Sequence, residues 1–386
     1  MRLRTAVHAA PVWNEFDVAQ GRTRPCVRLW KPVQGGPNSA KGAVVVELPD
    51  DPWQVDATAF PQHAALGDKL AFCLNYACLA PTGHATRPFL FRIGNSSVEV
   101  YANGTREHPV VDPEDRDVVT SCGAAIGHLE VALRHFGFVP RVMPADQFTP
   151  ERPLARVAVT GRHTPQRADE RLFRAMPVRG PAPHPVVAAE DAPADPMAAC
   201  REAAEACGVA FRVVRDKATL MRVADLVSEG NRRQFADPRF PRELAAWTRA
   251  HRMGGDPRGA RGYGMPDRLS AQARMMTRSE SLGAADEGAA GPDDLPALAL
   301  VATAMETPTA WLSTGRALSR IHLTLATAGL TNAYLTEPVA MDALRPGLRT
   351  ALGEPGFPQL VLQISQGTAI PPAGRQAVAD LLLKSD

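Results

Sequence analysis

The stretch from Ala80 to Phe89 has the residue types best suited to hold a ligand. It reads Ala-Pro-Thr-Gly-His-Ala-Thr-Arg-Pro-Phe. Two threonine hydroxyls, the backbone N–H groups around Gly83 and the cation of Arg87 suit a flat polar heterocycle or a phosphate. From residue types alone, an ordinary turn between a helix and a strand is the favoured interpretation.

Sequence signatures of side-chain catalysis and of metal binding are missing. The chain contains no P-loop, GxSxG or HExxH motif, and no GxGxxG follows a strand. His128 and His135 share one helical face without an acidic neighbour, which indicates packing or surface roles. The six cysteines form no CxxC pair and none lies beside histidines at metal-ligand spacing. We therefore expect no catalytic side chain, no metal, and buried reduced thiols.

Composition narrows the class of protein. The 386 residues are 45% hydrophobic, which is enough for sizeable cores, and the excess of arginine over lysine is typical of high-GC bacterial genomes. The net charge is only +2, so neither nucleic acid nor a membrane surface is an expected partner. The longest apolar run, 297–305, is too short to span a bilayer, and the start lacks an apolar signal region. These features predict a cytoplasmic protein.

Hydrophobic periodicity predicts a mixture of helices and strands after a Pro- and Gly-rich segment. Residues 1–62 read as an extension with one strand candidate, 43–48. Residues 254–294 contain few large apolar residues and read as a long, partly mobile loop. The predicted elements are a helix over 66–79, a hairpin with arms 89–92 and 98–101, a strand over 156–160, helices over 196–207, 218–231 and 241–249, a strand over 297–305, a helix over 311–328, a strand over 360–364 and a last short helix after Arg375.

Two segments of the chain are alike. Residues 122–137 and 314–329 match glycine with glycine at both ends, at an offset of 192 residues, about half of the chain. Each predicts a helix that stops at a glycine in the left-handed conformation and then runs into a Pro-containing loop and a β-branched strand. The match predicts a duplication with function at the seam between two halves. The alternative is a chance likeness between two Ala/Leu-rich helices.

The order of several motifs resembles the nitroreductase superfamily, specifically its Acg-like subfamily, in which two nitroreductase-type halves lie in one chain. Ala77–Phe89 resembles that family's A-P-S-x-H-N-T-Q-P-W loop. The motifs that follow in the family's order are 98–102, 112–116, 121–125, 172–176, 242–247, 311–318 and 358–362. The resemblance covers roughly residues 65–380.

The resemblance implies an α+β, nitroreductase-like fold whose two similar halves form a pseudo-dimer. The domains would be the extension 1–62, a first half 63–190 and a second half 191–386, with 254–294 as a candidate lid. A fused pseudo-dimer is expected to be monomeric. Because the second half has no Pro-Thr-Gly turn, we expect at most one flavin site.

The resemblance also implies FMN in the seam, with NAD(P)H as reductant and a small or peptide-borne substrate. The flavin would carry the hydride chemistry, so no acid–base side chain is needed. The implied cofactor residues are Pro81, Thr82, Gly83, His84 and Arg87 in the covering loop, Thr336 and Glu337 with a backbone N–H near flavin N5, and Arg179 and Arg375 at the phosphate.

The chain departs from the family pattern at two points that bear on FMN. Ala85 stands where the family has asparagine, and Pro183 stands where the family has the second arginine of an R-x-T-N-R stretch. Losing one charge-assisted phosphate contact costs about 2 kcal/mol, or roughly thirtyfold in affinity. Three functions follow as alternatives: an FMN-dependent oxidoreductase, a protein that sequesters FMN without turnover, and a flavin-free pseudoenzyme that acts as a partner or scaffold.

Overall fold

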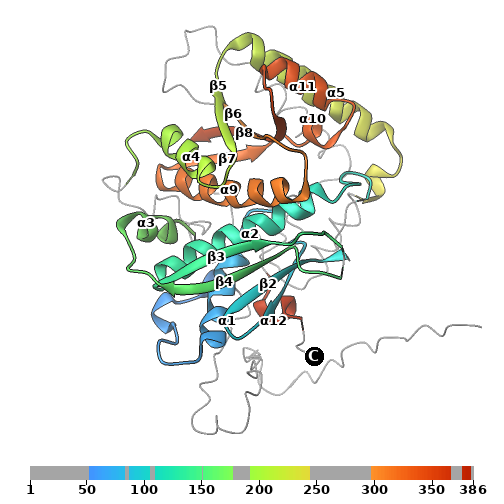
Figure 1. Ribbon diagram of the computed structural model, residues 1–386. Helices are drawn as coiled ribbons and strands as arrows, with labels where there is room; N and C mark the ends of the chain where they lie inside the picture. Colours follow the sequence, from blue (N-terminus) through green and yellow to red (C-terminus); the bar gives the residue numbers. More distant parts are fainter. Residues whose placement is uncertain are drawn as a thin grey trace, which may run out of the picture.

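The computed structural model describes residues 52–82, 87–104, 109–149, 151–176, 192–243, 297–366 and 376–383. Within these ranges the fold is α+β, with two four-stranded antiparallel sheets and two long helices between them (Figure 1). None of the described helices is long and apolar enough to cross a membrane.

The first sheet is built from the segment up to residue 162 and has the order β1-β2-β4-β3. Gly94 donates its N–H to Ser97 in the turn between β1 and β2, as the predicted hairpin requires. Two short 3₁₀ helices (Pro52–Gln54 and Ala57–Ala59) precede this part. Its elements are α1 (Leu66–Ala77), β1 (Phe89–Ile93), β2 (Ser97–Ala102), α2 (Arg116–His135), β3 (Phe138–Pro144), β4 (Ala155–Arg162) and α3 (Arg167–Ala175).

The second sheet has the corresponding order, β5-β6-β8-β7. Side chains of Asp195, Asp216 and Thr307 cap the N-termini of its three longer helices, which is why those helices begin where they do. Its elements are α4 (Pro196–Glu205), β5 (Ala210–Val214), α5 (Lys217–Ala236), β6 (Ala297–Thr303), α9 (Pro308–Thr327), β7 (Leu330–Tyr334), α10 (Glu337–Ala340), α11 (Arg345–Leu352) and β8 (Phe357–Gln366).

Helices α2 and α9 lie side by side between the two sheets (Figure 1). Small residues allow their backbones to touch: a Cβ on Gly315 would lie 2.8 Å from the Cα of Gly123, and one on Gly127 would lie 2.5 Å from the Cβ of Ser319. Both pairs step forward by four residues, one helical turn, so the two helices run in the same direction. Both helices end as predicted, with φ of 83° at Gly137 and 68° at Gly329.

The C-terminal segment returns to the first sheet. After α12 (Val378–Leu381), Leu382 forms a parallel bridge with Phe91, and the N–H of Leu383 donates to the Phe91 carbonyl at 2.8 Å. Val378 and Leu381 are buried in the core of the first sheet. The last part of the chain therefore covers the exposed edge of β1.

The sequence predicted a loop directly after each of the two long helices, and this prediction is wrong. Residues 138–144 and 330–334 are strands β3 and β7, each paired along its length with the strand that the sequence did predict, β4 or β8. Pro140 sits at a register shift in the ladder between β3 and β4, which is where a strand tolerates proline. Residues 1–51, the strand candidate 43–48, the predicted helix beyond residue 243 and the candidate lid 254–294 lie outside the described residues.

Candidate functional site

The structure describes five of the nine residues that the resemblance implies for a cofactor. Pro81 and Arg87 are buried, and Thr82, five residues after the end of α1, is half-buried. Thr336 precedes α10, and Glu337, which begins it, is 3% exposed. Gly83, His84, Arg179 and Arg375 lie outside the described residues.

Arg87 has an unusual backbone. Its φ is +49°, in the left-handed region that residues with a side chain adopt only at a cost, and the residue is 6% exposed. Strained backbone of this kind is found preferentially at ligand clamps and active sites. Asp115, at the start of α2, has a similar φ of +56°, so this conformation alone does not assign a function to the loop.

Both implied segments contact the first half of α2. The Sγ of Cys122 lies 3.3 Å from the carbonyl oxygen of Pro88, directly after Arg87. One and a half turns earlier, Arg116 donates to the carbonyl oxygen of Val339 in α10 at 3.1 Å. Six helical residues span about 9 Å, so the two segments meet the same end of one helix from different parts of the chain.

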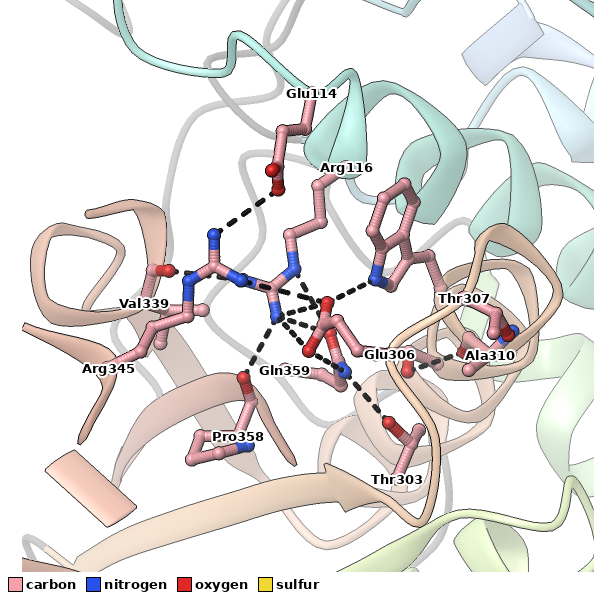
Figure 2. Close-up of polar contacts among 12 residues, drawn as sticks. Glu114, Arg116, Thr303, Glu306, Thr307, Ala310, Val339, Arg345, Pro358 and Gln359 are labelled. Carbon is pink, nitrogen blue, oxygen red and sulfur yellow. Dashed lines mark hydrogen bonds and ion pairs between the residues drawn. The ribbon is translucent and has the colours of Figure 1, made fainter. Parts of the chain in front are cut away.

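Arg116 is the centre of a polar network at this end of α2 (Figure 2). Its guanidinium donates to Val339 and to the carbonyl oxygen of Pro358 at 3.1 Å each, and to the Oε1 of Gln359 at 2.6 Å. It also forms an ion pair with Glu306 at 3.1 Å. Every acceptor belongs to the part of the chain beyond residue 297, so this one side chain ties α2 to β8, to α10 and to the start of α9.

Glu306 and Gln359 are held in turn by their own partners. Trp311 donates its indole N–H to Glu306 at 2.6 Å, and the amide of Gln359 donates to the hydroxyl of Thr303 at 2.7 Å. Arg345 reaches Glu306 at 3.8 Å and Glu114 at 3.3 Å (Figure 2). Burial and the neighbouring Arg345 lower the pKa of Arg116 from its usual value, while Glu306 acts in the opposite direction.

Asp112 fixes where α2 begins. Its carboxylate accepts the backbone N–H groups of Arg116, Asp117 and Val118 at 2.9, 2.8 and 3.2 Å. Burial, with the charge of Asp117 nearby, raises the pKa of Asp112 to about 7, and the three hydrogen bonds oppose that rise. The cap sets the register of α2 and thereby the position of Arg116.

Asn231 lies on α5 next to the residue that touches α10. A Cβ on Gly230 would lie 2.6 Å from the Cβ of Glu337, so the backbone of α5 approaches α10 closely. Asn231 is 5% exposed, and neither its amide oxygen nor its amide nitrogen has a hydrogen-bond partner among the residues described. Buried amides are almost always hydrogen-bonded, so this group suits a polar ligand atom.

The chemical types of the described residues suit the isoalloxazine ring of a flavin. The buried Oγ1 of Thr82 and the amide of Asn231 have no described partner and could serve a polar heterocycle. The guanidinium of Arg116, in contrast, donates its hydrogen bonds to protein acceptors, so it does not serve as a phosphate ligand. The cations implied for the phosphate, Arg179 and Arg375, lie outside the described residues.

Sequence reasoning assigned no role to Arg116, Glu306, Gln359 or Asn231. Arg116 and Gln359 did fall within motifs of the family order, but a single sequence carries no signal that pairs two residues 243 positions apart. Asn231 is an ordinary polar residue on a helix until its burial is known. The cysteines behave as predicted where they are described: Cys73, Cys78, Cys122, Cys200 and Cys207 are buried and form no disulfide.

The chain is similar to mycobacterial proteins over most of its length. It is 26% identical over 337 residues to "Putative NAD(P)H nitroreductase Rv3131" of Mycobacterium tuberculosis strain H37Rv, which covers 84% of this chain and 94% of that protein. It is also 26% identical over 311 residues to "Uncharacterized protein Rv3127" of the same strain, which covers 75% of this chain and 84% of that protein. No protein-family model matches the chain. The first similarity supports the predicted relationship to the nitroreductase superfamily.

Proposed function

We propose that this chain is an FMN-dependent oxidoreductase of the Acg-like nitroreductase type, with NAD(P)H as hydride donor and a small or peptide-borne substrate. The observation that carries the proposal is the meeting of two segments at one end of α2. Arg87–Pro88 and α10 are far apart in sequence, the resemblance implies both for a flavin, and both contact the first two turns of α2. The sequence similarity to a protein named as an NAD(P)H nitroreductase also supports the proposal.

We further propose that the two sheets with their long helices are the two halves of a pseudo-dimer. The strand orders match, and the glycines matched at an offset of 192 residues touch each other. A Cβ on Gly123 would clash with the carbonyl oxygen of Leu312, and one on Gly315 would clash with that of Thr120, which is 192 residues before Leu312. Such exchanged contacts are what a twofold axis produces.

One flavin per chain is the proposed stoichiometry. The connection between α1 and β1 runs over residues 78–88 and contains the candidate loop. The corresponding connection between α4 and β5 runs only over 206–209 and ends in the tight turn of Gly208, with φ of 72°. A four-residue turn has no length to cover a flavin ring, so only one of the two symmetric sites would be complete.

Different residues of the chain would contact the ring and the phosphate of the cofactor. Pro81, Thr82 and Arg87, with Gly83 and His84, would cover one face of the ring, and Thr336 and Glu337 would bound it from the other half. Arg179 and Arg375 would neutralise the phosphate. FMN would supply the hydride-transfer chemistry, and Arg116 would act as a positioning residue because it anchors α10 through Val339.

The flavin content of the purified protein tests this proposal. We expect about one FMN per chain, released by heating and identified by its absorption, and bleaching of that absorption when NAD(P)H is added without oxygen. Flavin that binds but is not reduced by NAD(P)H would favour sequestration instead. A colourless protein that takes up no added FMN would overturn the proposal in favour of the flavin-free alternative.

The matched variants are Arg375→Ala and Arg141→Ala. Arg375 is the proposed phosphate ligand, whereas Arg141 is an exposed residue of β3. The first should weaken FMN binding by about tenfold or more, roughly 1.4 kcal/mol, and the second should leave it unchanged. Restoring the family residues with Ala85→Asn and Pro183→Arg should strengthen binding.

A further inference from the structure

A cleft at the other end of α2 lies outside the proposed flavin site. Its volume is about 510 Å³, within the range of small-molecule sites in proteins. It is bounded by the segment before α1, by α1 itself, by the end of α2 and by the end of β4 with the residues that follow. Its lining residues are Ala57, Thr58, Phe60, Gln62, Lys69, His135, Phe136, Gly137, Arg162 and Pro165.

Lys69 gives this cleft a positive charge that the surrounding protein does not neutralise. The residue is 8% exposed, and its side chain lines the cleft. No hydrogen bond or ion pair joins its ammonium group to any other residue that the structure describes. Its Nζ is not among the buried side-chain nitrogens that lack a partner, so the stem is buried while the ammonium group reaches the water of the cleft, where an anion can meet it.

The rest of the lining strengthens the positive field. Arg162 is exposed, with its guanidinium carbon 4.7 Å from the ring centroid of Phe138. His135 is held by Glu170 at 3.0 Å, and burial lowers the pKa of its imidazole, so Lys69 and Arg162 carry the charge near neutral pH. None of the lining residues that the structure describes carries a carboxylate, and the nearby Glu170 is bonded to His135.

An aromatic wall stands beside these cations. The rings of Phe60 and Phe136 stack at 4.1 Å between centroids, with 7° between their planes, and both line the cleft. Phe136 also packs edge-on against Phe173 at 5.4 Å, which fixes the wall in place. A rigid apolar surface next to two cations favours a ligand with a planar apolar part and an anionic head.

We propose that this cleft binds a small organic anion, a carboxylate or a phosphate ester attached to a planar apolar group. The anionic head lies between Lys69 and Arg162, and the planar group packs against Phe60 and Phe136. The site is separate from the proposed flavin site: His135 at the cleft and Cys122, which contacts the candidate flavin loop, are about 20 Å apart along α2.

Calorimetry with benzoate on the full-length protein at low salt tests the site. We expect saturable binding of one benzoate per chain, and binding about tenfold weaker for benzamide, which keeps the ring and loses the charge. Phenyl phosphate identifies the preferred head: binding tighter than that of benzoate assigns the site to phosphate esters, and weaker binding assigns it to carboxylates. Inorganic phosphate should bind more weakly than phenyl phosphate, because it makes no contact with the aromatic wall.

Three variants connect the binding to the named residues. Lys69→Met keeps the apolar stem and should weaken benzoate binding by about tenfold or more, and Arg162→Gln should weaken it by about threefold or more. Arg141→Gln removes the same charge from the neighbouring strand β3, outside the cleft, and should change it by less than twofold. If Lys69→Met does not fold, Arg162→Gln decides alone, because Arg162 is exposed.

Several results would overturn this inference. They are no binding of any probe to the wild-type protein, equal binding of benzoate and benzamide, or an unchanged affinity in both Lys69→Met and Arg162→Gln. The flavin absorption of the same samples gives a separate readout, so failure here leaves the proposed function standing, and a colourless protein leaves this site standing.

Discussion

At the scale of single residues, Arg116 alone makes most of the described polar contacts that join α2 to α10, to β8 and to the start of α9. Its planar guanidinium reaches two backbone carbonyls, one amide oxygen and one carboxylate, and the residue is 6% exposed. A lysine at this position would keep the charge but has a single donor centre that cannot match acceptors in several directions. The carbonyls of Val339 and Pro358 would then remain buried without their donor, which is costly.

We therefore predict that Arg116→Lys lowers the free energy of unfolding by about 2–4 kcal/mol. Urea denaturation followed by circular dichroism measures the change. The matched control is Arg141→Lys, an exposed position where the same substitution should cost less than about 0.5 kcal/mol. Equal stability of the two variants would show that the network contributes nothing to folding.

Asp169 makes α3 sensitive to acid. Its partial burial would raise the carboxyl pKa, but hydrogen bonds from His163 at 2.6 Å, from the backbone of Gln166 at 2.9 Å and from Arg134 at 2.7 Å outweigh burial and hold the pKa below its usual value. A depressed pKa stabilises the folded state above the ordinary range of an aspartate. That contribution is lost as the pH falls through the lowered pKa.

Asp169→Asn should therefore destabilise the protein by about 1–3 kcal/mol at neutral pH, and the gap to the wild type should close as the pH falls below about 4. Thermal unfolding at a series of pH values measures both quantities. Asp146→Asn, at an exposed position, should have no comparable effect at any pH. If the difference in stability between the wild type and Asp169→Asn stays constant at the lowest pH measured, the lowered pKa of Asp169 is not what stabilises the fold.

At the scale of elements, the contact between α2 and α9 depends on the absence of side chains at Gly123 and Gly315. A methyl group on Gly315 would lie 2.7 Å from the backbone nitrogen of Ala124, closer than real contacts allow. Two backbones cannot shift as a flexible side chain can, so the helices themselves would have to separate.

Gly123→Ala and Gly315→Ala should each lower the free energy of unfolding by about 1–3 kcal/mol or more, despite alanine's higher helix propensity. Gly161→Ala is the matched control. There the added Cβ would meet only the Val139 side chain, at 3.9 Å, so the change should stay within about 0.5 kcal/mol. Stability unchanged or increased in both helix variants would contradict the close contact.

The elements that the sequence predicted correctly are those with strong local signals. The hairpin of β1 and β2 has a turn between alternating strands, and α2 and α9 have helical periodicity with terminal glycines. Strands β3 and β7 lack such signals: Phe138–Pro144 contains two prolines, and all residues of β7 are only partly buried. Their strand structure comes from pairing with β4 and β8, which is a tertiary effect.

The candidate site was predictable only in part, for the same reason. The loop near Pro81 and the segment at Glu337 were found through a resemblance that depends on motif order. The network of Arg116, Glu306 and Gln359 depends on contacts between residues about 190 and 243 positions apart, which no local pattern encodes. The cleft at Lys69 was not anticipated either, because the helix over 66–79 is apolar on most of its surface and the ammonium group of a lone lysine ordinarily reaches solvent without marking a site.

At the scale of the whole molecule, the second sheet has two apolar clusters of its own, but the core of the first sheet is completed by residues from the second part of the chain. Trp311, Leu312 and Leu323 belong to α9, yet they are buried in the cluster formed by α1, α2 and the first sheet. The C-terminal residues Val378 and Leu381 are buried in that same cluster. Unfolding of the first sheet and its helices would therefore expose apolar side chains of α9, and loss of α9 would leave the first core incomplete.

This sharing predicts one cooperative unfolding transition and a monomeric chain. Calorimetry should give a single peak whose van't Hoff enthalpy equals the calorimetric enthalpy, because both halves unfold together. Light scattering should give the mass of one chain, 41.4 kDa, since α2 and α9 already bury the surfaces that two separate subunits would pair. The same calorimetric test applies to a variant: Gly315→Ala should lower the temperature of the single unfolding peak without splitting it into two. Two resolved transitions, or an obligate dimer, would mean that each half is stabilised independently and that the shared core is not what holds the fold together.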